Sequence, residues 1–113
     1  MTTVYKICSR SEWSAAERTG FFDGSDVDRR DGFIHLSDAG QVRETARKHF
    51  SGQDDLVLVA FDADAFGDAL RWEASRGGAL FPHVYGRLPA GEAEAVIPLP
   101  RDAAGELVFP GGL

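Results

Sequence analysis

The sequence is short of the features that mark secreted, membrane-spanning and nucleic-acid-binding proteins. Cys8 is the only cysteine among 113 residues, so an internal disulfide is impossible and a reducing, cytoplasmic environment is expected. No apolar run approaches the roughly 20 residues of a membrane span, and no basic segment followed by an apolar stretch marks a secretion signal. The formal net charge of −6 argues against non-specific binding to nucleic acid, which needs a basic surface.

The apolar pattern that is present predicts an α+β fold in a single domain, residues 1–113. Hydrophobic residues make up 43% and charged residues 27% of the chain, which is typical of a globular protein with a core. Helices are predicted at 9–20, 39–50 and 62–70. Strands are predicted at 4–7, 33–37, 56–61, 71–73, 80–86, 96–100 and 107–109, so they cluster late in the chain.

Capping signals fix the ends of the first two helices. Ser9 with Glu12 forms a capping-box pattern, and Gly20 is a plausible stop signal for the same helix. Asp38 with Gln41 repeats the pattern before the second helix. Between these helices, residues 21–31 are bounded by the turn pairs Asp23-Gly24 and Asp31-Gly32 and contain several charges, which predicts an exposed loop.

Two strands carry polar side chains on one face. Alternate residues of a strand share a face, so His35 and Ser37 point one way while Ile34 and Leu36 point into the core. The same alternation in residues 80–86 places Phe81, His83 and Tyr85 on one face. A proline at position 82 predicts that this segment is an edge strand or an irregular strand. Two such strands are expected to line one cleft.

The chemistry of these groups suits a nucleotide-like ligand. Imidazole nitrogens and hydroxyls both donate and accept, as ribose and amide groups require. A tyrosine ring is able to stack on a flat base, and arginine or lysine binds a pyrophosphate. The predicted ligand-binding residues are Tyr5, Lys6, His35, Ser37, Arg71 and Tyr85, the acid–base candidates are Glu73 and His83, and further phosphate candidates are Arg29, Arg30 and Arg87.

Two alternatives stay open beside the ligand pocket. The first is a non-enzymatic interaction module in which the histidines are structural. The second is a metal-dependent hydrolase that uses His35, His83 and Glu73 as ligands, although no two of them stand at a recognised metal-motif interval. Cys8 follows an apolar strand, which is typical of an inert buried thiol. The sequence contains neither a phosphate-binding loop nor a dinucleotide-binding glycine motif.

Three motifs resemble the DUF952 family of small bacterial proteins of unknown function. They are DGFIHLS at 31–37, RWE at 71–73 and FPHVYG at 81–86, and the resemblance extends from residue 5 to about residue 98. It implies a fold and no particular activity.

A more distant resemblance concerns RNA 2′-phosphotransferases, NAD-using enzymes with the ADP-ribosyltransferase fold. It rests on residues 34–37, a helix that contains Ala46, and the apolar strand at 56–62. It implies a split, mostly antiparallel sheet with two or three helices around a cleft for NAD or ADP-ribose. His35 would occupy the place of the cleft tyrosine of poly(ADP-ribose) polymerases, with Tyr5 and Lys6 on the opposite wall. The companion catalytic motifs of these enzymes are absent, so the resemblance implies the fold and the ligand class and not ADP-ribosyl transfer.

Overall fold

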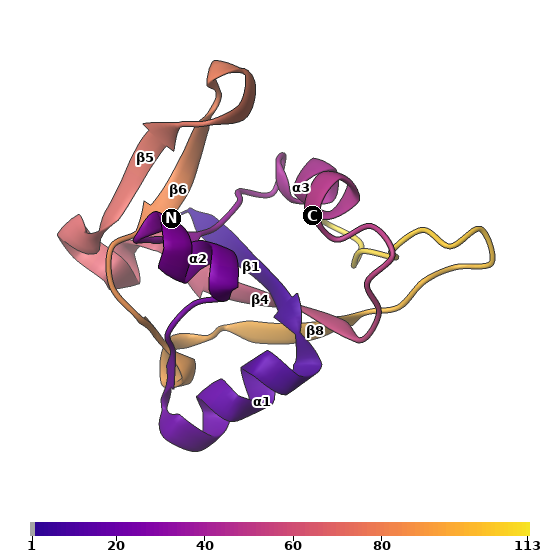
Figure 1. Cartoon of the computed structure of the whole chain (residues 1–113), viewed down its shortest axis with the longest axis horizontal. Helices are drawn as coiled ribbons and strands as arrows, with labels where there is room; N and C mark the ends of the chain where they lie inside the picture. The colour runs from indigo at the N-terminus through magenta and orange to yellow at the C-terminus, as the bar shows by residue number, and fades with distance from the viewer. Residues whose placement is uncertain (1) are drawn as a thin grey trace.

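Two three-stranded antiparallel sheets form the framework of the computed structural model, which describes residues 2–113 (Figure 1). The first sheet has the order β1-β4-β8, with β1 at Thr3–Ser9, β4 at Leu56–Asp62 and β8 at Ala95–Leu99. The second has the order β3-β6-β5, with β3 at Ile34–His35, β6 at Leu80–Val84 and β5 at Leu70–Ala74. A short antiparallel pair joins β2 (Phe21–Phe22) to β7 (Leu88–Pro89).

Three α-helices and three 3-10 helices connect the strands of the described chain. The α-helices are α1 (Arg10–Thr19), α2 (Asp26–Asp31) and α3 (Val42–His49), and the 3-10 helices are η1 (Ala63–Ala69), η2 (Arg76–Gly78) and η3 (Ala90–Glu92). The predicted α+β class is therefore correct, with antiparallel sheets. Over residues 2–113, no helix has the length and apolar character needed to cross a bilayer.

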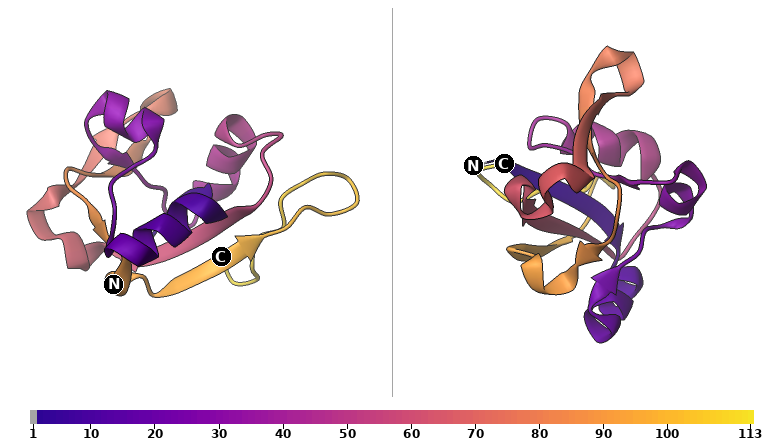
Figure 2. Two further views of the ribbon diagram at one scale, coloured as in Figure 1. Left: turned by 60° about the horizontal axis from the view of Figure 1, so that its bottom comes forward. Right: turned by 90° about the vertical axis from the view of Figure 1, so that its left-hand side faces the viewer.

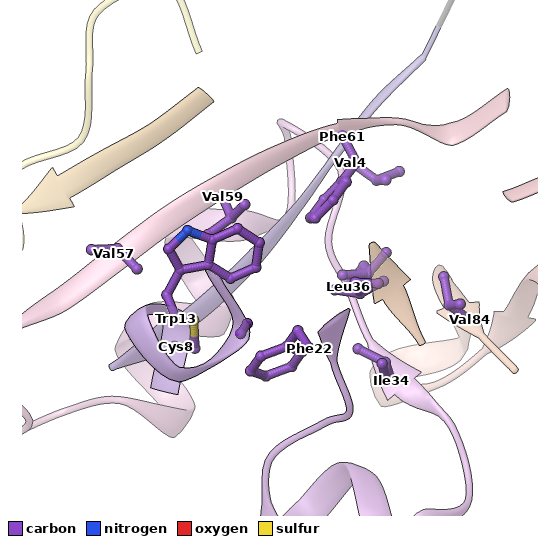
Figure 3. Close-up of a cluster of buried hydrophobic side chains, with 12 residues drawn as sticks. Val4, Cys8, Trp13, Phe22, Ile34, Leu36, Val57, Val59, Phe61 and Val84 are labelled. Atoms are coloured by element: carbon purple, nitrogen blue, oxygen red, sulfur yellow. The ribbon is translucent and has the colours of Figure 1, made fainter. Parts of the chain in front are cut away.

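Strand β4 is the centre of the core because it has a strand on each side and apolar side chains on both faces. Its successive side chains alternate between faces. Val57 and Val59 lie in one cluster with Trp13 of α1, which Figure 3 shows packed over them. Leu56 and Leu58 lie in a second cluster with α3. The continuous apolar run at 56–61 thus predicts a central strand correctly.

The local signals at the two predicted helix starts are confirmed. The Ser9 hydroxyl accepts from the Glu12 N–H while the Glu12 carboxylate accepts from the Ser9 N–H, and Gly20 ends α1 at φ +96°. Asp38 and Gln41 exchange the same two hydrogen bonds, at 2.9 and 3.1 Å. The regular helix α3 nevertheless begins at Val42, three residues later than predicted.

The prediction of an exposed loop at 21–31 is wrong. Residues 21–22 pair with β7, and α2 follows with its own capping box between Ser25 and Asp28. Asp28 is buried, with 3% of its surface exposed. The helix was overlooked because six mostly charged residues show no apolar periodicity, even though the cap pattern is present in the sequence.

The prediction that Pro82 confines its strand to an edge is also wrong, since β6 runs between β3 and β5. Proline cannot donate a backbone hydrogen bond. The nitrogen of Pro82, which has no hydrogen to donate, faces the β3 side of the strand. Strand β3 ends at His35, which pairs with His83. Leu36 N still donates to Pro82 O at 3.0 Å, so only the last bond of the ladder is lost.

Two smaller predictions fail near the end of the chain and on α3. Residues 107–109 form no strand, because their only ladder contact is an isolated bridge from Leu107 to Arg101. The i, i+4, i+7, i+8 spacing of Val42, Ala46, His49 and Phe50 predicts a buried stripe on α3, but His49 is exposed. Val42 and Ala46 are buried as expected, and Phe50 is partly buried.

Candidate functional site

A cavity of about 590 Å³ opens between β1, α2, α3 and the β3–β6 pair. All three histidines of the chain, His35, His49 and His83, line it. They come from β3, α3 and β6, which lie far apart in the sequence. Ser37 lies between them, because the chain after β3 leaves the second sheet and bridges to the first one at Tyr5. The fold therefore gathers polar side chains from both sheets around one cavity.

Asp28 anchors one wall of this cavity. Its Oδ2 accepts from Lys6 Nζ at 2.8 Å and from Ser25 N at 2.9 Å, while its Oδ1 lies 2.7 Å from His35 Nδ1 and accepts from His35 N at 3.1 Å. Burial by itself raises the pKa of Asp28, but the hydrogen bond from His35 and the charge of Lys6 outweigh it and hold the pKa well below its usual range. Asp28 is therefore an ionised carboxylate at neutral pH.

Lys6 is committed to the same network. Its ammonium group donates to Asp28 and to the carbonyl oxygen of His35, at 3.1 Å, and the residue is only 5% exposed. Lys6 lines the cavity as predicted, but two of its three donors are occupied within the protein.

His35 is held between two carboxylates. Its Nδ1 faces Asp28, and its Nε2 lies 3.0 Å from Asp31 Oδ2. Only an imidazole that carries protons on both nitrogens donates to both carboxylates at once. The side chain is 32% exposed, so the ring is positioned by protein contacts yet accessible from the cavity.

His83 belongs to a second carboxylate–histidine pair. Its Nδ1 lies 2.8 Å from Glu73 Oε1, and the Tyr85 hydroxyl donates to the same oxygen at 2.8 Å. The hydrogen bonds from His83 and Tyr85 lower the pKa of Glu73, while the bond to Glu73 raises the pKa of Tyr85. Because a carboxylate only accepts, the Nδ1 proton points to Glu73, and in the tautomer that this bond selects Nε2 is the acceptor. A carboxylate that orients histidine in this way is a common arrangement for a general base.

Phe33 connects the two histidine sites. Its ring stacks on His83 at 4.2 Å between centroids, and it lies 4.7 Å from the His35 ring and 5.3 Å from the Tyr85 ring. The ring centroids of His35 and His83 are 5.4 Å apart. The guanidinium group of Arg71 lies over the Tyr85 ring, 4.8 Å from its centroid. The two polar strands predicted from sequence therefore do face one region.

The predicted site residues fall into two groups in space. Those that line the cavity are Tyr5, Lys6, His35, Ser37 and His83. Those that lie beyond His83, outside the cavity lining, are Arg71, Glu73 and Tyr85. Strand alternation places Phe33 on the face of His35 and Ser37, as its ring contacts with both histidines show. The sequence interpretation missed Asp28, Asp31 and Thr45, of which Asp28 has a sequence signal, its capping pattern with Ser25.

The predicted phosphate-binding arginines are mostly engaged elsewhere. Arg29 donates to Gly24 O and Asp26, and Arg87 forms a two-bond pair with Asp23. Only Arg30 lines the cavity. As for a metal, no group of three or more histidine, cysteine, aspartate or glutamate side chains is placed to hold one in the part of the chain that the structure describes.

A larger groove of about 730 Å³ lies between α3 and the C-terminal segment, and no histidine of the described chain lines it. Arg101, its most buried cation, donates to Gly105 O, Phe50 O, Gln53 O and the carboxylate of Asp54. This arginine thus holds the end of α3 to the C-terminal segment. We assign the groove a structural role and the histidine-lined cavity the functional one.

Comparison with known proteins gives a family and no activity. A family model described as "Protein of unknown function (DUF952)" matches residues 7–96. The crystal structure of protein CC0527 from Caulobacter crescentus is 52% identical with a TM-score of 0.91, and the match covers 95% of this chain and 94% of that one. The solution NMR structure of CC0527 is 54% identical with a TM-score of 0.84, over 94% and 91% of the two chains. No curated protein matches the sequence. A family match over most of the chain, supported by structures that share half of its residues, shows that the chain belongs to the DUF952 family.

Proposed function

We propose that the cavity binds a nucleotide such as NAD or ADP-ribose. The observation that carries the proposal is that all three histidines meet at one cavity together with Ser37 and Tyr5. Its volume of about 590 Å³ is within the range of roughly 300–1,000 Å³ that small-molecule sites occupy. Kinship with the ADP-ribosyltransferase fold is part of the proposal, and the two antiparallel sheets on either side of the cavity support it.

The hydrogen-bonding groups of the cavity suit a ribose. Ribose hydroxyls both donate and accept, so they pair with carboxylates and with imidazole nitrogens. Asp31, which His35 positions, presents a carboxylate on the α2 side, and His83 Nε2 presents an acceptor on the β6 side. The ring of Tyr5 offers a surface on which a base is able to stack.

The charges of the cavity favour NAD over a purely anionic ligand. Four carboxylates line it, those of Glu12, Asp26, Asp28 and Asp31, which outnumber the side-chain cations Lys6 and Arg30 even when His35 carries protons on both nitrogens. The oxidised nicotinamide ring carries a positive charge, which the carboxylate excess stabilises. We place the pyrophosphate toward Arg30, because Lys6 is already bound to Asp28.

We assign the acid–base role in any reaction at this site to His83, with Glu73 as its positioning partner. Nε2 of His83 has no hydrogen-bond partner within residues 2–113, and the residue lines the cavity. The single thiol, Cys8, is free and buried, which is compatible with the proposed cytoplasmic location in a bacterium.

Calorimetric titration with NAD and with ADP-ribose tests the binding proposal. We expect saturable binding that His35→Ala abolishes. Arg30→Ala and Arg29→Ala form a matched pair on α2, since only Arg30 lines the cavity. Arg30→Ala should weaken both ligands, and Arg29→Ala should leave the affinity unchanged. Thermal melts of each variant confirm that it is folded.

The same experiment separates the proposal from a non-enzymatic interaction module. That alternative predicts no heat of binding with either nucleotide, together with lower melting temperatures for His35→Ala and His83→Ala. Binding that survives His35→Ala unchanged would place the ligand elsewhere and overturn the site assignment.

A further inference from the structure

Strand β5 leaves one edge of its sheet open. It is the outermost strand of the order β3-β6-β5, at the outside of the hairpin in Figure 1. Tyr85 N donates to Ala69 O and Ser75 N donates to Ala79 O, so the odd-numbered residues of this strand bond to β6. Backbone groups alternate in direction along a strand. The N–H and C=O groups of Trp72 and Ala74 therefore point outward, and no residue among 2–113 pairs with them.

The sequence of this edge is complementary to itself. When two copies of β5 pair antiparallel with Trp72 opposite the partner's Trp72, Arg71 comes to lie opposite the partner's Glu73. The twofold axis repeats that pair, so Glu73 lies opposite the partner's Arg71 as well. Opposite charges at directly facing positions stabilise a pair of strands. A single edge thus supplies two ion pairs and the mutual backbone bonds between the two Trp72 residues.

The side-chain exposure fits the same arrangement. Trp72 is 40% exposed and Leu80, paired with Ala74, is 55% exposed, although both are large and apolar. They lie on the face opposite Arg71 and Glu73. The hairpin of β5 and β6 projects from the rest of the molecule in Figure 1 and in the right view of Figure 2, which leaves room beside it. Exposed apolar patches of this kind mark interaction surfaces.

We propose that β5 is a homodimer interface, formed by antiparallel pairing with β5 of a second copy about a twofold axis at Trp72. The β3-β6-β5 sheets of the two copies then become one six-stranded sheet. A twofold axis perpendicular to the sheet keeps Arg71 of one copy on the same face as Glu73 of the other. The partner's Arg71 meets the Glu73 carboxylate, whose side chain is 35% exposed and whose Oε1 is bonded to His83. Dimerisation thus places the partner's Arg71 guanidinium beside Glu73, the carboxylate that orients His83.

Analytical ultracentrifugation over a wide concentration range tests this proposal without any ligand. We expect the wild-type chain to associate reversibly to twice its mass. Arg71→Glu places two like-charged pairs across the interface and should weaken dimerisation by roughly tenfold or more. Arg18→Glu makes the same charge change on α1 and should have no effect. The double variant R71E/E73R restores opposite charges and should recover the dimer.

Ala74→Pro provides a second, independent probe, because the Ala74 N–H points away from β6. Proline at position 74 has no N–H, so it removes the hydrogen bond that Ala74 N would donate to the partner strand and removes none within the monomer. The dimer should therefore be lost, while the melting temperature of the monomer is retained. A wild-type chain that stays monomeric at all concentrations would overturn the proposal. A dimer that persists in both Arg71→Glu and Ala74→Pro would also overturn it, by placing the interface elsewhere.

Discussion

Replacing Asp28 by alanine should remove a large part of the stability of this fold. The carboxylate is 3% exposed and is the acidic partner of the Lys6 ammonium, at 2.8 Å. It also accepts from His35 and from Ser25, so it holds α2 against β1 and β3. Without it a buried ammonium keeps one protein acceptor, the carbonyl oxygen of His35.

The size of the effect follows from the loss of one member of a buried ion pair. Such a loss costs about 3–5 kcal/mol, because the other charge stays buried without compensation. A domain of this size has a total stability of about 5–15 kcal/mol, and 1 kcal/mol shifts its melting temperature by about 4 °C. We therefore expect Asp28→Ala to lower the melting temperature by about 12–20 °C.

Urea denaturation followed by circular dichroism measures this change, with Lys6→Met as the second arm of a double-mutant cycle. In the Lys6→Met background no buried ammonium remains, so Asp28→Ala should cost clearly less than it does alone. The reasoning is refuted if Asp28→Ala destabilises the wild-type chain by less than about 1 kcal/mol. It is also refuted if the two substitutions are additive.

The pH dependence of stability provides an independent check on the same residue. The pKa of Asp28 is lowered in the folded protein, so the unfolded chain binds its proton first as the pH falls. The stabilisation is complete above the unfolded pKa of about 3.9 and is lost as the pH drops through that value toward the folded pKa. The stability difference between the wild type and Asp28→Asn should therefore narrow steadily below about pH 5.

Two further predictions concern other positions in the fold. Burial raises the pKa of Cys8 to about 12, so a thiol reagent at mildly alkaline pH should modify it only at the rate of global unfolding, and rapid labelling of the native protein would contradict its buried placement. Gly24 has φ +105°, and a Cβ there would lie 2.9 Å from Asp28 Cβ, so Gly24→Ala should cost more than the roughly 1–2 kcal/mol of left-handed strain alone. Gly52→Ala is its control in chemical denaturation, because Gly52 has φ +79° with no atom within 4 Å and should show the strain alone.

Sequence reasoning succeeded where the signal was local. The start of α1 is encoded by Ser9 and Glu12, three residues apart, and its end by Gly20. The central strand is encoded by six consecutive apolar residues at 56–61. These features depend on neighbours within a few positions, so composition and spacing are sufficient to find them.

The failures all depend on contacts between distant residues. Asp28 was assigned to a solvated loop because its burial requires Lys6, 22 residues earlier in the chain. Pro82 was assigned to an edge because the sequence does not reveal that its missing donor faces the end of a two-residue strand. Residues 107–109 have strand-like composition, but no neighbouring strand is available to them. For the candidate site, the chemistry of His35 and His83 was visible, whereas the exclusion of Tyr85 and Arg71 from the cavity lining was not.

The pairing of β1 with β4 also has a consequence for the order in which the protein is made. Thr3 pairs with Asp62 and Ser9 with Leu56, so β1 has no partner in β4 until about 50 further residues have been synthesised. The cavity is completed later still, because its lining includes His83. Contacts with such long separations in sequence form slowly. During translation the strand at 3–9 therefore stays unpaired until residues 56–62 have been made, and we expect it to be a segment at which chaperones bind the nascent chain.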